Sequence, residues 1–224
     1  MSVNLEKYGE LLAELKNKGI TLVAVSKTKP VDSIRELYEE GQRDFGENYV
    51  QELLEKKEVL PEDIRWHFIG HLQSNKAKYL VPFVHLIHGV DSIRLLKEIN
   101  KQAEKTGRIQ SVLLQVHIAQ EETKFGLDED ELSGFMNDHH ELASMKNILI
   151  SGLMAMASFT DNEQQLRNEF GQLKKLFDQY RNLNLFNCQF TVLSMGMSND
   201  YSIAIEEGSN LVRIGSLIFG KRIG

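Results

Sequence analysis

The sequence predicts an α/β protein: a single (β/α)8 TIM barrel with an extra N-terminal helix. First, short β-rich runs alternate with amphipathic helical stretches eight times along the 224 residues. Second, the β-rich runs are apolar almost throughout, which is typical of parallel strands buried on both faces. Third, no Pro-, Gly- or Ser-rich stretch divides the chain, so we expect residues 1–224 to form one domain. A doubly wound open sheet is the alternative.

The first expected element is the charged amphipathic helix MSVNLEKYGELLAELK, residues 1–16, which does not have the pattern of a signal peptide. The expected strands are short runs of β-branched, aromatic and other apolar residues. They occupy residues 21–27, 44–47, 65–70, 85–91, 111–119, 148–156, 190–197 and 211–220.

The helices expected between these strands have apolar residues at three- and four-residue spacing. They cover residues 33–41, 49–60, 74–81, 92–107, 162–184 and 201–208. Gly41, Gly107 and Gly208 stand at the ends of three of them, where a helix C-cap prefers glycine. Pro30 is expected to end the first strand and to open the helix that follows it.

Composition limits the class of function. The net charge of −6 argues against a non-specific nucleic-acid binder, which needs a basic surface to displace counterions from phosphates. No apolar segment reaches the roughly 18 residues that cross a bilayer, so we expect a cytoplasmic protein without membrane contact. The single cysteine, Cys188, excludes an internal disulfide and is expected to be a buried small hydrophobe.

The site of such a barrel lies at the C-terminal ends of its strands. The residues expected there are Ser26, Lys27, Gly46, Glu47, Asn48, Gly70, His71, Asp91, the 124–126 loop that begins with Lys124, Met154, Met156, residues 194–198, Arg213, Gly215 and Ser216.

Lys27 is the most informative of these residues because it follows four apolar residues without a turn. An amine held near apolar walls has a lowered pKa and is a neutral nucleophile. If the strand persists, Lys29 lies on the same face, and a second ammonium there disfavours charge on Lys27 further. This chemistry suits a Schiff base with an aldehyde or a ketone.

The last two strand ends predict an anion site. Ser198 or Asn199 is expected at the N-cap of the helix over residues 201–208, where free backbone amides attract an anion. Gly215 allows the backbone to approach a ligand closely, and Ser216 offers a hydroxyl. Glycines at strand ends are also ordinary turn formers. Opposite a buried lysine, however, these loops indicate a ligand with a carbonyl at one end and a phosphate at the other.

The histidines do not predict a metal site. His67 and His71 are four residues apart, but their segment reads as a strand and a turn, so they would not share a helical face. His85 and His88 occupy strand or loop positions without a carboxylate cluster nearby in the sequence.

The chain resembles the pyridoxal phosphate homeostasis family, whose fold looks like the barrel of bacterial alanine racemase standing alone. The resemblance runs through AVSKTKP, FGENYVQE, WHFIGHLQSNK, KFGL, GLMAM, LSMGMSND and VRIGSLIFG. It implies that pyridoxal 5′-phosphate is the cofactor and that the protein takes part in vitamin B6 homeostasis.

The resemblance also implies roles for individual residues. Lys27 would hold the cofactor as an aldimine, and Asn48 would lie near it. Ser198, Gly215 and Ser216 would hold the phosphate, with Ser194 as a second choice, and Arg213 would face the pyridine nitrogen. The implied partners are the cofactor and pyridoxal-phosphate-dependent apoenzymes, and the expected state is a monomer or a weak dimer.

An amino-acid racemase or a related enzyme is the alternative function. Barrel racemases resemble this chain and share the arginine, but they also use a tyrosine from a second domain. The chain stops at Gly224 without room for that domain, so we expect cofactor binding without racemase turnover. A Schiff-base aldolase acting on a phosphosugar is a more distant alternative.

Overall fold

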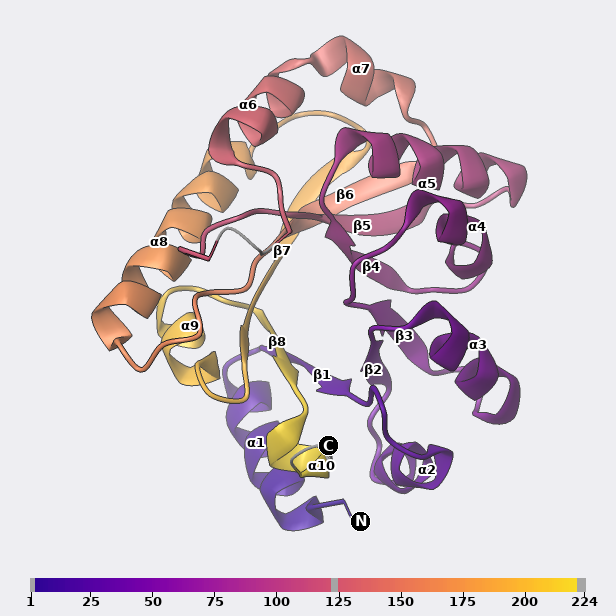
Figure 1. Ribbon diagram of the computed structural model, residues 1–224, viewed down its shortest axis with the longest axis vertical. Helices are drawn as coiled ribbons and strands as arrows, with labels where there is room; N and C mark the ends of the chain where they lie inside the picture. The colour runs from indigo at the N-terminus through magenta and orange to yellow at the C-terminus, as the bar shows by residue number, and fades with distance from the viewer. Residues whose placement is uncertain (1–2, 122–124, 221–224) are drawn as a thin grey trace.

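The computed structural model describes residues 3–121 and 125–220, and these residues form a closed barrel of parallel strands in the order β1 to β8 (Figure 1). The strands are β1 Thr21–Val25, β2 Asp44–Glu47, β3 Arg65–Phe68, β4 Leu86–Val90, β5 Gln110–Gln115, β6 Ile148–Met154, β7 Cys188–Met197 and β8 Leu211–Ile214. The barrel closes because β1 pairs with both β2 and β8, which excludes the open sheet.

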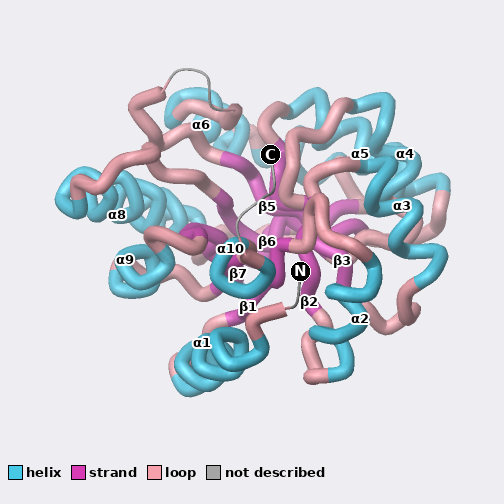
Figure 2. The backbone as a smooth tube through the Cα atoms, turned by 60° about the horizontal axis from the view of Figure 1, so that its bottom comes forward, coloured by secondary structure: helices cyan, strands magenta, loops and turns pink. Residues whose placement is uncertain are grey.

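Helices surround the strands, as Figure 2 shows. They are α1 Leu5–Asn17, α2 Val31–Glu39, α3 Val50–Val59, α4 Ala77–Leu80, α5 Ile93–Lys105, α6 Glu129–Asn137, α7 His139–Ser144, α8 Glu163–Tyr180, α9 Tyr201–Glu206 and α10 Ser216–Phe219, with a short 3₁₀ helix η1 at Ser74–Lys76. The extra N-terminal helix α1 lies beside α10, and the Asn4 amide donates to the carbonyl of Ile218 at 2.8 Å.

Side chains alternate along each strand between the barrel interior and the surrounding helices, which produces an inner and an outer apolar layer. In β1, Leu22 and Ala24 pack outward against the helices, whereas Val23 packs inward. Val23 shares a small interior cluster with residues from four other strands, namely Leu86, Leu113, Met154 and Leu211. Successive side chains of a strand point to opposite faces, so each strand contributes to both layers.

Glycines close three of the predicted helices. Gly41, Gly107 and Gly208 have φ values of 96°, 65° and 101°, the left-handed region that a helix C-terminus requires. These three predictions are therefore confirmed. Pro30 opens α2 as its N-cap, as predicted, but the prediction that it ends the first strand is wrong, because β1 ends at Val25. Helices α6 and α7 were not among the predicted helices.

Six of the eight predicted strands extend too far at their C-terminal ends, including the first and the last. The first ends at Val25 rather than at residue 27, and the last ends at Ile214 rather than at residue 220. The segment after Gly215 forms α10, because a short apolar run such as SLIF fits one helical turn as well as a strand. Within the described ranges, no helix is both long enough and apolar enough to span a lipid bilayer.

Candidate functional site

Lys27 lies in a tight turn directly after β1. The Ser26 amide donates to the carbonyl of Gly46 at 3.0 Å, which continues the pairing of β1 with β2 by one residue. The Lys29 amide then donates to the carbonyl of Ser26 at 3.0 Å, and Thr28 has a φ of 62°. A threonine rarely adopts this left-handed backbone, so the turn needs support from its neighbours.

Three side chains of β2 and α3 supply that support, and we call Glu47, Glu52 and Lys56 the turn clamp. Glu47 Oε1 accepts from Ser26 Oγ at 2.6 Å, and Glu52 Oε1 accepts from the Thr28 amide at 2.6 Å. The buried Lys56 Nζ donates to the Ser26 carbonyl at 2.8 Å and to both carboxylates at 2.7 Å. Hydrogen bonds from the turn clamp therefore fix the backbone on both sides of Lys27, at Ser26 and at Thr28.

The turn clamp places the charged side chains of Glu47 and Lys56 in the protein interior. Burial raises the pKa of the Glu47 carboxyl, and the Lys56 ammonium opposes this rise only in part. Glu47 was predicted at the barrel rim, but the sequence analysis missed Glu52 and Lys56. Their spacing of four residues on α3 was the available signal, because side chains at i and i+4 lie on one helix face.

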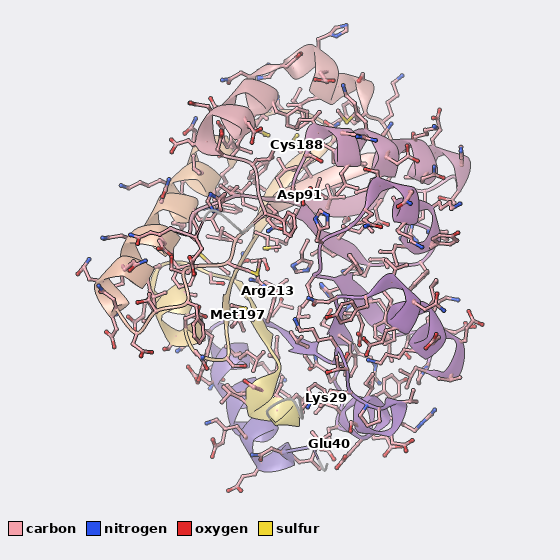
Figure 3. All side chains as sticks on the ribbon, viewed as in Figure 1. Lys29, Glu40, Asp91, Cys188, Met197 and Arg213 are labelled. Carbon is pink, nitrogen blue, oxygen red and sulfur yellow. The ribbon has the colours of Figure 1, made fainter. Side chains whose placement is uncertain are left out.

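Lys29 is not beside Lys27 on a strand face. Its Nζ donates to the carbonyls of Phe219 and Gly220 at 2.9 and 3.2 Å, at the end of α10. Figure 3 shows Lys29 next to that helix. The prediction that both lysines share a strand face is wrong, because β1 ends at Val25 and Thr28 reverses the backbone. Lys124, also predicted at the rim, lies outside the described residues.

The loops after β7 and β8 meet next to the Lys27 turn. The Gly215 amide donates to Ser198 Oγ at 3.3 Å, which joins the two loops. A Cβ at position 215 would lie 3.1 Å from the carbonyl oxygen of Val25, so this glycine packs against β1. Ser216 begins α10 immediately after it. The predicted N-cap at Ser198 or Asn199 is wrong, since Asp200 is the N-cap of α9.

Arg213 and Ser194 face the barrel interior, one strand apart. Arg213 donates from Nη1 to Ser194 Oγ at 2.6 Å and from Nη2 to the Ala155 carbonyl at 2.9 Å. Burial lowers the pKa of Arg213 to about 10, although Asp200 opposes this, so the guanidinium stays charged at neutral pH. Figure 3 shows Arg213 in the middle of the molecule. The Ser194 hydroxyl is engaged there, inside β7, and does not belong to the loops after β7 and β8.

The polar contacts continue from Ser194 across the barrel. His88 Nδ1 lies 3.1 Å from Ser194 Oγ, His88 Nε2 lies 2.9 Å from His67 Nδ1, and His67 Nε2 lies 3.0 Å from Asp44 Oδ1. We call the five residues from Asp44 to Arg213 the interior chain. Sequence reasoning missed it because its members come from strands that are distant along the chain.

His71 is separate from the interior chain. It lies at the rim, where Nδ1 is 2.8 Å from Asp91 Oδ2 and the ring stacks on Phe125 at a centroid distance of 4.1 Å. His67 and His71 are therefore not brought together. In residues 3–121 and 125–220, no group of three or more His, Cys, Asp or Glu side chains could hold a metal ion.

Asn48 follows β2 at the same end of the barrel. Its Oδ1 is buried and has no hydrogen-bond partner among the described residues. It lines a cavity of about 500 Å³ together with Tyr49, His71 and Lys76. A buried polar atom without a partner costs free energy, so this position suits a ligand that donates a hydrogen bond.

The donor set as a whole fits a carbonyl compound with an anionic group. An amine at Lys27, hydroxyls and amides at Ser198, Gly215 and Ser216, and a cation at Arg213 come from the neighbouring strands β7, β8 and β1. Such a site can bind an aldehyde, hold a phosphate and balance its charge.

Comparison with known proteins gives consistent results. Residues 4–222 match the family model described as alanine racemase, N-terminal domain. The chain is 43% identical to the pyridoxal phosphate homeostasis protein of Aquifex aeolicus, over 90% of this chain and 86% of that protein. It is 42% identical to the human protein of the same name, over 90% of this chain and 76% of the human chain.

Solved structures are similar over nearly the whole chain. PipY of Synechococcus elongatus, solved with PLP bound, is 35% identical, with a TM-score of 0.83, and the match covers 94% of this chain and 99% of PipY. Alanine racemase of Streptomyces coelicolor has a TM-score of 0.75 at 16% identity, and the match covers 99% of this chain and 60% of the racemase. The racemase shows similarity of fold alone.

Proposed function

We propose, from the premise that this chain belongs to the family of pyridoxal phosphate homeostasis proteins, that it binds pyridoxal 5′-phosphate reversibly and keeps it available in the cell. The finding that carries this proposal is the match to family members over 90% of the chain, including a relative solved with PLP bound. The local geometry supports it, since the donors required by an aldehyde and a phosphate stand at one end of the barrel.

The register of β1 and β8 supports the assignment of residues. Val23 pairs with Arg213 and Ala24 pairs with Ile214, so Gly215 stands level with the end of β1. The turn with Lys27 and the loop with Ser216 are therefore neighbours. We propose Lys27 as the amine that bonds to the aldehyde carbon, and Ser198, Gly215 and Ser216 as the phosphate ligands.

The other residues have supporting roles. Asn48 Oδ1, which lacks a partner among the described residues, would accept a hydrogen bond from the bound molecule, and Arg213 would supply a positive charge on the interior side. When bound, pyridoxal phosphate supplies an electrophilic aldehyde and a ring that accepts electrons. The turn clamp keeps the Lys27 backbone in one conformation, so less conformational entropy is lost when the ligand binds.

A storage and delivery role fits better than racemisation. Proton exchange on both faces of a substrate carbon needs two positioned groups. Tyr201 is the tyrosine nearest the phosphate loops in the sequence, but it packs against the outer layer, where Glu14 of α1 lies beside it. Delivery to cytoplasmic apoenzymes is part of the proposal.

The test is the absorption spectrum of the purified protein with pyridoxal phosphate, before and after borohydride, followed by mass mapping of the modified lysine. The pyridoxyl group is expected on Lys27, and Lys27→Ala should lose both the visible band and the label. Lys29→Ala is the matched control, because it removes an amine two residues away that bonds to α10, and it should keep both. A label found mainly on Lys29 would refute the assignment.

A further inference from the structure

The interior chain joins the buried Arg213 to the buried Asp44 through two histidines and a serine. Arg213 donates to Ser194, and the chain ends at Asp44, which also accepts from Arg65 Nε at 2.7 Å. Its members are all buried, and His88 and Ser194 are fully so.

The chemistry of its two end residues gives the interior chain one direction of hydrogen-bond donation. A guanidinium has only donors, and an ionised carboxylate has only acceptors. Burial would raise the pKa of Asp44, but hydrogen bonds from Arg65 and His67 outweigh burial and hold it well below its usual range. Asp44 is therefore ionised at neutral pH, and His67 Nε2 must carry a proton.

The protons of His88 and Ser194 can be placed next. Burial lowers the pKa of His88 well below its usual range, and the nearby Arg213 charge lowers it further, so His88 is neutral. Ser194 Oγ already accepts from Arg213, and the one acceptor for its own proton among the described residues is His88 Nδ1. His88 then carries its proton on Nε2 and donates it to His67 Nδ1.

We infer that Asp44, His67, His88 and Ser194 are positioning residues that orient Arg213 toward the bound ligand through one directional set of hydrogen bonds, with both histidines in the Nε2–H form. Of the five N–H groups of the guanidinium, Ser194 and Ala155 accept two within the described part of the chain. In the proposed function, one or more of the other N–H groups would donate to the ligand. This last step rests on the proposed function, whereas the proton order does not.

The test uses Asp44→Asn and nitrogen-15 NMR of histidine in the ligand-free protein. In the unaltered protein, both His67 and His88 should be protonated on Nε2. In the variant, the amide oxygen is expected to take the place of Oδ2 and accept from Arg65 Nη2, while the NH₂ takes the place of Oδ1 opposite His67 Nε2. The half-exposed Arg65 then moves its Nε away from that position. The donors then reverse, and both histidines should change to the Nδ1–H form.

Asp63→Asn is the matched control. Asp63 is an exposed carboxylate that pairs with Arg43 at 2.9 Å and does not touch the interior chain, so both histidines should keep their form. Should Asp44→Asn not fold, Ser194→Ala is the second variant. It removes the donor to His88 but leaves Asp44, and both histidines should remain in the Nε2–H form.

Binding provides the second measurement. The Kd for pyridoxal 5′-phosphate should rise about tenfold in Asp44→Asn and in Ser194→Ala, the effect of about one mispaired buried hydrogen bond, and should not change in Asp63→Asn. Histidines in the Nδ1–H form in the unaltered protein, no change of form in Asp44→Asn, or an unchanged Kd in both interior variants would each overturn the inference. Failure of the unaltered protein to bind would refute the proposed function instead, and the NMR result would stand.

Discussion

Removal of the Lys56 ammonium tests the turn clamp. Lys56→Met keeps most of the side-chain length but deletes three hydrogen bonds, two of them to carboxylates at 2.7 Å. The Glu47 side chain is 0% exposed, so the variant leaves a buried carboxylate without its cation. Breaking a buried ion pair in this way costs about 3–5 kcal/mol, a large share of the roughly 5–15 kcal/mol that stabilises a typical domain.

The loss should depend on pH. Burial already raises the folded-state pKa of Glu47, and loss of Lys56 should raise it further. A carboxyl with a raised folded-state pKa binds its proton more tightly in the folded protein than in the unfolded chain. Stability therefore falls as pH rises from the unfolded pKa through the folded one. The deficit of Lys56→Met should be full at pH 8 and smaller near pH 5.

Urea denaturation at both pH values measures these free energies. Lys18→Met is the matched control, since Lys18 and Glu14 are also four residues apart at 2.9 Å but lie on the surface, and it should cost about 0.5 kcal/mol or less. The double variant Lys56→Met/Glu47→Gln should recover about 2 kcal/mol, because no buried charge is left alone. Equal losses at pH 5 and pH 8, or no recovery in the double variant, would refute the reasoning.

Three further outcomes are expected. Gly152→Ala should cost about 3 kcal/mol in urea denaturation, because φ is 147° and a Cβ would lie 1.9 Å from a carbonyl oxygen of β7. Gly134→Ala, in open space on α6, should instead gain about 0.5–1 kcal/mol; equal effects would contradict this difference. Burial raises the pKa of Cys188 to about 11, so iodoacetamide at pH 8 should label only unfolded protein, and rapid native labelling would disprove the assignment. With L-alanine in deuterated water, we expect only slow deuteration with retained configuration, because racemisation needs a second positioned base, worth about 10²–10⁴-fold, and Tyr201 packs in the outer layer. Rapid D-alanine formation that Lys27→Ala or Tyr201→Phe abolishes would establish the racemase.

The sequence was informative about the rim because topology determines which residues reach it. In a parallel barrel every strand ends at the same face, so Lys27, Asn48 and Ser198 could be placed together from strand order alone. The details of that rim were less predictable. The end of β1 was placed two residues late, because nothing in VAVSK distinguishes a strand end from the turn that Glu52 and Lys56 stabilise.

Hydrophobic periodicity and helix-capping glycines are local properties, and from them the sequence by itself determined the barrel and its helical layer. Strand order also placed Lys27 at the rim, two residues beyond the end of β1. The tertiary structure alone decided which polar side chains meet. Asp44, His67, His88 and Ser194 lie on four different strands, and their contacts depend on the register between strands and on which face each residue presents. A shift of one residue would turn each of these side chains to the other face, so such contacts arise only when the barrel closes.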